Sequence, residues 1–168
     1  LIYTRLARLL GASKVVAAGR RALRLQTARR LGADEALDVG ETSCLDHIKE
    51  ALGGAPDVLI DATGGDIMDP IRKLARPGMK LIPYGVPPFA WKDRMGLLAE
   101  AGIHSCNGGA PSARHALRQC VRWAEEGSLG LQPIVTHRLP LAHVGLGLDL
   151  CREQPDHTLK VVVTINPE

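Results

Sequence analysis

The first 38 residues follow an order of elements that is typical of a parallel α/β sheet. Apolar residues in 1–10 lie on one helical face, and Gly11 offers a left-handed stop. The run Lys14–Ala18 is continuously apolar after its first residue, as expected of a strand buried on both faces. A helix is predicted over Ala22–Leu31 and a strand over Ala36–Val39. This order is the second half of a βαβαβ unit, so we expect the first strand and its glycine-rich turn to lie outside the sequence.

The same alternation continues beyond residue 40. Ser43, with Asp46 three residues later, resembles a capping box at the start of a helix that ends at Gly53. Asp69 followed by Pro70 indicates the start of another helix. Strands are predicted at 57–60, 80–84 and 102–106. Strands that alternate with helices at this spacing predict a parallel sheet with right-handed crossovers.

A long helix is expected after this sheet, and the chain then changes character. Ser112 is placed to cap the helix, whose core face would carry Leu117, Cys120, Val121 and Ala124. The C-terminal part is predicted to form a strand at 134–138, a helix near 141–151 and a strand at 159–165. We therefore expect two parts, residues 1–130 and residues 131–168.

Composition disfavours several classes of protein. A length of 168 residues suits one domain with a short appendage, and a net charge of +3 is mild. The four cysteines form no Cys-x-x-Cys pair, no signal peptide is recognisable, and no apolar run approaches the roughly 20 residues of a membrane span. These features favour a cytoplasmic protein without a membrane partner. Fifteen arginines against six lysines are more informative, because guanidinium groups suit phosphates and carboxylates.

The turn after the first predicted strand reads Gly19-Arg20-Arg21. In doubly wound sheets, ligands lie across the carboxyl ends of the strands. An acidic residue in this turn would accept hydrogen bonds from the ribose of an adenine nucleotide and repel a 2′-phosphate. A glycine and two arginines instead leave room for that phosphate and donate to it. The alternative is a solvated basic start of a helix, which the helix dipole disfavours. The pattern therefore favours a phosphate contact.

Three further turns follow predicted strands and carry weaker signals. The small residues of Asp61-Ala62-Thr63-Gly64-Gly65 allow a flat ligand to approach the backbone, although an ordinary strand-to-helix turn explains them equally well. The turn Gly85-Val86-Pro87 is weaker still, and a plain loop explains Cys106-Asn107 better. Gly145-Leu146-Gly147 is rejected as a phosphate loop, because it lies in a predicted helix and has Leu150 where a third glycine is needed.

Several motifs, taken in order, resemble one protein family. The segments LARLLGASKVVAAGRR and RLGADEALD are followed by DVLIDATGG, RPGMKLIPYGV and HTLKVVVTI. This set is similar to the cofactor-binding half of the medium-chain dehydrogenases, the family of zinc-type alcohol and polyol dehydrogenases. The resemblance implies an incomplete Rossmann-like doubly wound parallel sheet that lacks its first strand and is truncated before or within the phosphate loop. It also implies that residues 131–168 belong to the catalytic domain, with an apolar face partly exposed in this chain.

The resemblance also assigns roles to residues at the strand ends. The turn that contains Gly19, Arg20 and Arg21 selects between NAD and NADP in the family, and this version is similar to the NADP type. The other implied cofactor contacts are Ala62, Thr63 and Gly64 on the adenine side, Gly85, Val86, Cys106 and Asn107 near the nicotinamide, and Lys160 at the phosphates. For Lys160, an edge-strand lysine that discourages aggregation is an equal alternative.

We expect the parts that carry the family's chemistry to lie outside this sequence. The resemblance implies a longer parent dehydrogenase whose catalytic domain lies outside this sequence. In that domain a catalytic zinc would polarise an alcohol or carbonyl during hydride transfer. Cys44 and His47 have ligand chemistry but no partner pair, and the other histidines show no ligand spacing. No catalytic residue and no metal site are therefore assigned to this chain.

Three functions are hypotheses at this point. The first is the cofactor-binding portion of an NAD(P)-dependent dehydrogenase for a small alcohol or carbonyl substrate, with NADP preferred. Family members often dimerise through the edge strand that residues 102–106 resemble, which allows a homodimer. The second is a non-catalytic nucleotide-binding or interaction fragment. The third is nucleic-acid binding through an arginine cluster, and the mild net charge and few aromatic residues count against it. That cluster comprises Arg20, Arg21, Arg24, Arg29 and Arg30.

Overall fold

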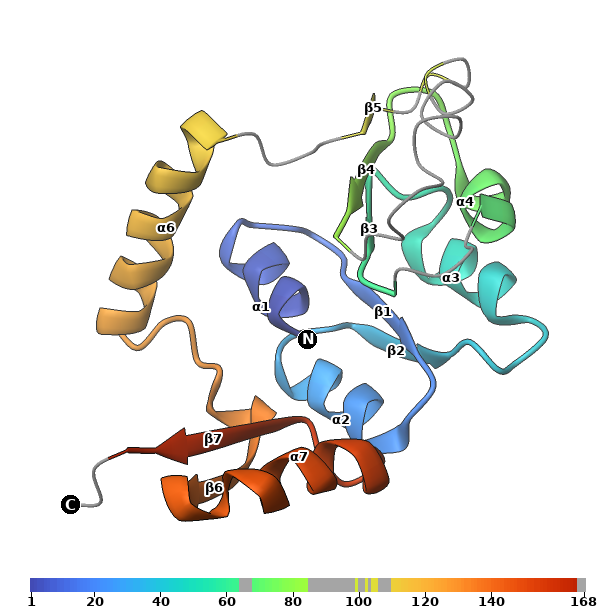
Figure 1. Ribbon diagram of the computed structural model, residues 1–168. Helices are drawn as coiled ribbons and strands as arrows, with labels where there is room; N and C mark the ends of the chain where they lie inside the picture. Colours follow the sequence, from blue (N-terminus) through green and yellow to red (C-terminus); the bar gives the residue numbers. More distant parts are fainter. Residues whose placement is uncertain (64–67, 85–98, 100–101, 103, 106–109, 166–168) are drawn as a thin grey trace. The chain divides into compact units, whose positions relative to one another are not determined.

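The computed structural model describes residues 1–63, 68–84, 99, 102, 104–105 and 110–165. The chain divides into two compact units, one made of residues 1–41 with 122–168 and the other of residues 42–121. The helices and strands of both units are labelled in Figure 1. The first unit thus joins the two ends of the sequence.

The N-terminal part of the first unit contains α1 (Ile2–Leu9), β1 (Val16–Gly19), α2 (Ala22–Arg30) and β2 (Glu35–Asp38). The two strands are parallel, with Gly19 opposite Asp38. Helix α2 packs against both strands (Figure 1), and the buried alanines there are Ala28, Ala33 and Ala36. The helices and strands predicted for residues 1–39 are confirmed to within two residues.

Arg8 ties α1 to the turn between α2 and β2. Its Nε donates to the carbonyl oxygen of Gly32 at 2.6 Å, and its Nη1 donates to that of Ala12 at 2.9 Å. Gly32 has a φ of +107°, and a Cβ on it would lie 2.7 Å from Cγ of Arg8. This turn therefore requires a glycine both for its backbone conformation and for the close approach of the arginine.

The C-terminal part of the first unit contains β6 (Val135–Pro140), α7 (Val144–Glu153) and β7 (Lys160–Thr164), with short 3-10 turns η1 (Gln132–Ile134) and η2 (Leu141–His143). β6 and β7 are parallel, and α7 lies along the pair in Figure 1. Gly147 of α7 is buried, because the helix approaches the strands so closely that a Cβ there would lie 3.1 Å from Cγ1 of Val161. The predicted order of strand, helix and strand is confirmed.

The second unit contains α3 (Cys44–Leu52), β3 (Val58–Asp61), α4 (Met68–Leu74), β4 (Lys80–Pro83) and the two-residue strand β5 (His104–Ser105). The three strands are parallel in the order β3-β4-β5. The buried core of this unit includes Ile71, Leu74, Met79 and Leu81. The parallel α/β class is thus confirmed in both units, and β5 lies within the strand predicted over 102–106.

The predicted N-caps of three helices are corrected, one in its hydrogen bonding and two in their position. Ser43 precedes α3, but its side chain makes no capping hydrogen bond, because its backbone (φ −89°, ψ 4°) is not in the extended conformation that a capping residue usually adopts. Asp69 lies inside α4, which already includes Met68, and therefore does not cap it. Ser112 likewise lies inside α6 (Ala110–Glu125).

The predicted core face of α6 is also corrected. Leu117 and Val121 are 65% and 47% exposed, so neither belongs to a buried core. Helical periodicity identifies side chains that share a face, but it does not identify an element that covers them. The apolar pattern of α6 thus predicted the helix correctly, but it wrongly predicted that Leu117 and Val121 are buried.

Candidate functional site

The carboxyl end of β1 is formed by Gly19, which contributes a backbone hydrogen bond and no side chain. The carbonyl oxygen of Gly19 accepts the amide of Val39 at 2.9 Å, which holds the ends of β1 and β2 together. A Cβ on Gly19 would lie 3.5 Å from Cδ2 of Leu25, an ordinary contact, and its φ is outside the left-handed region. The fold therefore does not require glycine here. The effect of Gly19 is on the chemistry of the turn, because a glycine leaves this strand end without a carboxylate.

Asp38 is the acidic residue that lies opposite Gly19 in the register of the two strands. Its Oδ1 accepts the amide of Gly40 at 2.8 Å, so this oxygen closes the turn that follows β2. One carboxylate oxygen of Asp38 is thus already used in a hydrogen bond within its own loop. It does not replace the carboxylate that the end of β1 lacks.

Two cations follow Gly19. Arg20 is exposed and has no hydrogen bond or ion pair within the described part of the chain. Arg21 occupies the N-cap position of α2 and pairs through Nε with Oδ1 of Asp156 at 2.9 Å. The first turn of α2 contains no acidic residue, and the cap makes no side-chain hydrogen bond. The start of α2 therefore follows two arginines, one exposed and one paired with Asp156, and a helix N-terminus with cations beside it favours an anion.

Arg24 belongs to the same basic cluster, and the sequence interpretation did not select it as a cofactor contact. Its Nε is buried, and no hydrogen-bond partner for it is found among the described residues. Arg24 lies in the first turn of α2, three residues after the N-cap residue Arg21. Its short distance along the sequence from Arg21 was the available signal that Arg24 lies near the start of α2.

The carboxyl end of β3 in the second unit is held by Asp61. Its side chain is 2% exposed, and its Oδ1 accepts the amide and the hydroxyl of Thr63 at 2.8 and 2.7 Å. Its carbonyl oxygen accepts the amide of Tyr84 at 2.7 Å. These bonds fix a turn in which Ala62 and Thr63 are exposed, as a ligand contact requires.

The remaining turn residues are divided between described and undescribed parts of the chain. Gly64, Gly85, Val86, Cys106 and Asn107 lie outside the described residues. Gly145 and Gly147 both lie in α7, in agreement with the rejection of this segment as a phosphate loop.

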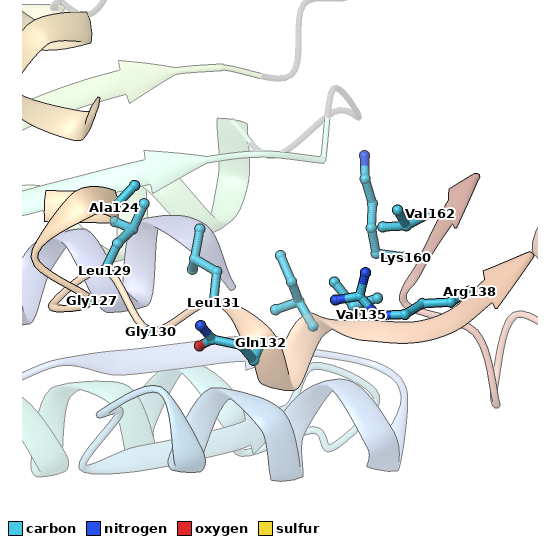
Figure 2. A pocket seen from close by; sticks show the side chains of 11 residues that line it. Ala124, Gly127, Leu129, Gly130, Leu131, Gln132, Val135, Arg138, Lys160 and Val162 are labelled. Atoms are coloured by element: carbon cyan, nitrogen blue, oxygen red, sulfur yellow. The ribbon is translucent and has the colours of Figure 1, made fainter. Parts of the chain in front are cut away.

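Lys160 begins β7 and lines a cleft of about 320 Å³ in the first unit. Figure 2 shows Lys160 and Arg138 among the side chains around this cleft. The other lining residues are mainly apolar or small: Ala124, Gly127, Leu129, Gly130, Leu131, Gln132, Ile134, Val135 and Val162. Lys160 is exposed, so its amino group is accessible to an anionic ligand.

The described residues do not fit a metal site. No group of three or more His, Cys, Asp or Glu side chains gathers there in a way that could hold an ion. Cys44 is buried at the start of α3, whereas His47 is exposed one turn later. No chemical step is therefore assigned to a metal held by the described part of this chain.

In the segments that the structure describes, no helix combines the length and the apolar character needed to cross a membrane.

Known proteins resemble this chain along most of its length. Residues 1–124 match the family described as zinc-binding dehydrogenase. An alcohol dehydrogenase from Cupriavidus necator is 28% identical over 161 residues, covering 94% of this chain and 44% of that protein. The structure of benzyl alcohol dehydrogenase from Acinetobacter calcoaceticus has a TM-score of 0.78 at 20% identity, covering 97% of this chain and 46% of that one. An alcohol dehydrogenase from Escherichia coli CFT073, solved with NADH, has a TM-score of 0.72 at 21% identity, covering 96% and 48%.

The chain thus spans less than half the length of these relatives. Its parallel α/β architecture matches the Rossmann-like cofactor-binding domain of alcohol dehydrogenases. The family match covers well over half of the chain and confirms the resemblance that its ordered motifs indicated. The chain belongs to the zinc-binding dehydrogenase family.

Proposed function

We propose that this chain is the cofactor-binding portion of an alcohol or polyol dehydrogenase that prefers NADP(H) to NAD(H). Its family and the alcohol dehydrogenase relative support the reaction class, hydride transfer between a nicotinamide and an alcohol or carbonyl substrate. The nicotinamide supplies the hydride chemistry when bound. The residues of this chain bind and orient the cofactor.

The NADP preference rests on the Arg20 guanidinium at the end of β1, which has no hydrogen bond or ion pair with the residues that the structure describes. Gly19 places no carboxylate at this strand end, and the first turn of α2 contains no acid. Arg20 therefore has no charged competitor in its own turn, and Arg21 and Arg24 add further donors. This donor set fits a 2′-phosphate, because guanidinium groups pair well with phosphate oxygens. The Nε of Arg24 is buried and finds no hydrogen-bond partner in the described part of the chain, which is further support for an incoming acceptor.

The strength of such contacts is sufficient to decide between the two cofactors. A hydrogen bond to a charged group contributes about 1.5–3 kcal/mol, which corresponds to about 10- to 150-fold in affinity. NAD(H) is the rival, since one structural relative was solved with NADH. NAD(H) lacks the 2′-phosphate and would leave Arg20 with solvent alone.

Other parts of the proposal rest on position in the fold. Ala62 and Thr63 are exposed at the end of β3 and would contact the adenine side of the cofactor. Lys160 would contact the cofactor phosphates. Residues 131–168 would complete the catalytic domain, and the edge strand at 104–105 would form a homodimer. A cytoplasmic location is part of the proposal and rests on the scattered cysteines of the sequence, which form no Cys-x-x-Cys pair.

A second candidate function is that of a non-catalytic interaction fragment. One observation favours it: large apolar side chains are exposed on η2 and α7, where Leu141 is 51%, Leu146 51% and Leu148 68% exposed. Such a face is suited to a protein partner. The catalytic-domain role proposed for residues 131–168 also explains these residues, because that domain would cover them.

Nucleotide titration of this chain tests the proposal. The ligands are adenosine 2′,5′-bisphosphate and 5′-AMP, and the readout is the amide chemical shifts of residues 19–25 by NMR, which detects weak binding. We expect the bisphosphate to bind about 10-fold or more tightly than 5′-AMP. Arg20→Gln should remove most of that difference. Arg30→Gln is the matched control, because it removes the same charge from the last turn of α2. Equal affinities for the two nucleotides would contradict the NADP preference.

A further inference from the structure

Arg21 and Asp156 form an ion pair between the start of α2 and the turn that precedes β7. Nε of Arg21 lies 2.9 Å from Oδ1 of Asp156, and the two side chains are 40% and 74% exposed. Both residues belong to the first compact unit. The fold thus brings an acid from the C-terminal part of the chain to the basic turn at the end of β1.

The backbone on each side of this ion pair is held in place. The carbonyl oxygen of Arg21 accepts the amide of Leu25 at 3.0 Å in the first turn of α2. The amide of His157 donates to the carbonyl oxygen of Gln154 at 3.0 Å, so Asp156 is the third residue of a β-turn. Pro155 precedes it in the turn position that proline favours. The pair therefore forms between two ordered segments, with little further loss of backbone entropy.

We propose that Asp156 limits the affinity of the Gly19-Arg20-Arg21 turn for a 2′-phosphate by competing for Arg21. This inference rests on the proposed function. The Asp156 carboxylate accepts from Nε of Arg21, a donor that a phosphate would also use. Its negative charge also repels a phosphate nearby. Asp156 is then a specificity-determining residue that narrows the preference for NADP over NAD.

A purely positioning role for Asp156 predicts the opposite sign. If the ion pair held Arg21 ready for the phosphate, loss of the carboxylate would leave the guanidinium less ordered and weaken binding. The exposure of both side chains favours competition, because solvent and ligand reach the pair and exposed ion pairs are weak. We expect loss of the carboxylate to strengthen phosphate binding by about two- to five-fold.

The experiment compares the unchanged chain with Asp156→Asn and Asp149→Asn. Asp149 is the matched control: it is an exposed acid on α7 that pairs with Arg152, and its substitution changes the net charge equally. Each protein is titrated with adenosine 2′,5′-bisphosphate and with 5′-AMP, and the NMR shifts of residues 19–25 give the dissociation constants. Far-UV circular dichroism checks that each variant is folded.

The expected result is a tighter complex of Asp156→Asn with the bisphosphate, an unchanged affinity for 5′-AMP and no effect of Asp149→Asn. A bisphosphate affinity that is unchanged or lower in Asp156→Asn overturns the inference. The proposed function still stands in that case if the unchanged chain binds the bisphosphate more tightly than 5′-AMP. An equal gain in both variants also overturns it, because the effect would then be one of net charge. Equal affinity of the unchanged chain for both nucleotides overturns the proposed function and the inference together.

Discussion

The carboxylate of Asp34 accepts a hydrogen bond from the backbone amide of Val15 at 2.7 Å. The amide of Asp34 returns a hydrogen bond to the carbonyl oxygen of Val15 at 2.8 Å, and Arg8 pairs with the same carboxylate. Asp34 therefore holds the entry to β1 from the start of β2. The Leu-Gly-Ala-Asp motif that ends with Asp34 is structural, and it contributes to the site by positioning the strand that ends at Gly19.

The Asp34 contacts make the stability of the chain dependent on pH. The Val15 amide, followed by Arg8, lowers the pKa of Asp34 from its ordinary value of 3.8. A group whose pKa is lowered by folding stabilises the protein above its unfolded pKa, and this contribution is lost as the pH falls through the folded pKa. We expect the urea midpoint of unfolding to fall more steeply between about pH 5 and pH 2 in the unchanged chain than in Asp34→Asn. Parallel curves for the two proteins would contradict this.

Gly32→Ala should destabilise the first unit. The substitution forces a side chain into a backbone with a φ of +107° and brings its Cβ to 2.7 Å from Cγ of Arg8. We expect a loss of about 1–3 kcal/mol in the free energy of unfolding, measured by urea denaturation. Gly145→Ala is the matched control, because that glycine lies in α7 with open space around its Cβ position. The control should gain about 0.5–1 kcal/mol, and a loss of the same size in both variants would show that the Arg8 contact is not the cause.

Local patterns predicted the order of elements because each of these elements carries its own signal. The apolar run at 14–18 became β1, and Gly53 ends α3 with a φ of +71°, as the predicted stop requires. Ser43 occupies the predicted N-cap position of α3, but its side chain makes no capping hydrogen bond, since such a bond depends on backbone angles that residue type alone does not determine. The exposure of Leu117 was missed for a related reason, because covering a helix face requires a second element.

The part of the candidate site that lies in one turn was predicted from the sequence. The part that the fold assembles from distant residues was missed. Gly19, Arg20 and Arg21 are consecutive, so their chemistry can be read from the sequence. The pairing of Arg21 with Asp156 joins residues from opposite ends of the chain, and no local pattern indicates it. The roles of Ala62, Thr63 and Lys160 in cofactor binding stay predictions, since exposure shows access and not contact with a ligand.

This chain should show no alcohol-dependent reduction of NADP, with or without added zinc. The described residues bring together no set of ligands that could hold a metal, and no catalytic residue is assigned among them. The assay follows absorbance at the reduced nicotinamide band with ethanol, benzyl alcohol and a polyol as substrates. If turnover is observed and a substitution within this chain abolishes it, catalytic residues lie in this chain and the assignment of none is wrong.

Gly19→Asp should reverse the nucleotide preference of the turn. The backbone at Gly19 accepts a side chain, since a Cβ there makes an ordinary contact of 3.5 Å with Leu25. The new carboxylate would repel a 2′-phosphate and accept hydrogen bonds from a free ribose hydroxyl. We expect the affinity for adenosine 2′,5′-bisphosphate to fall by about 10-fold or more, while the affinity for 5′-AMP stays equal or rises. Gly19→Asn has nearly the same shape without the charge, so it should lower bisphosphate affinity much less. An equal loss in both variants would assign the effect to the shape of the side chain and contradict an electrostatic selection at this strand end.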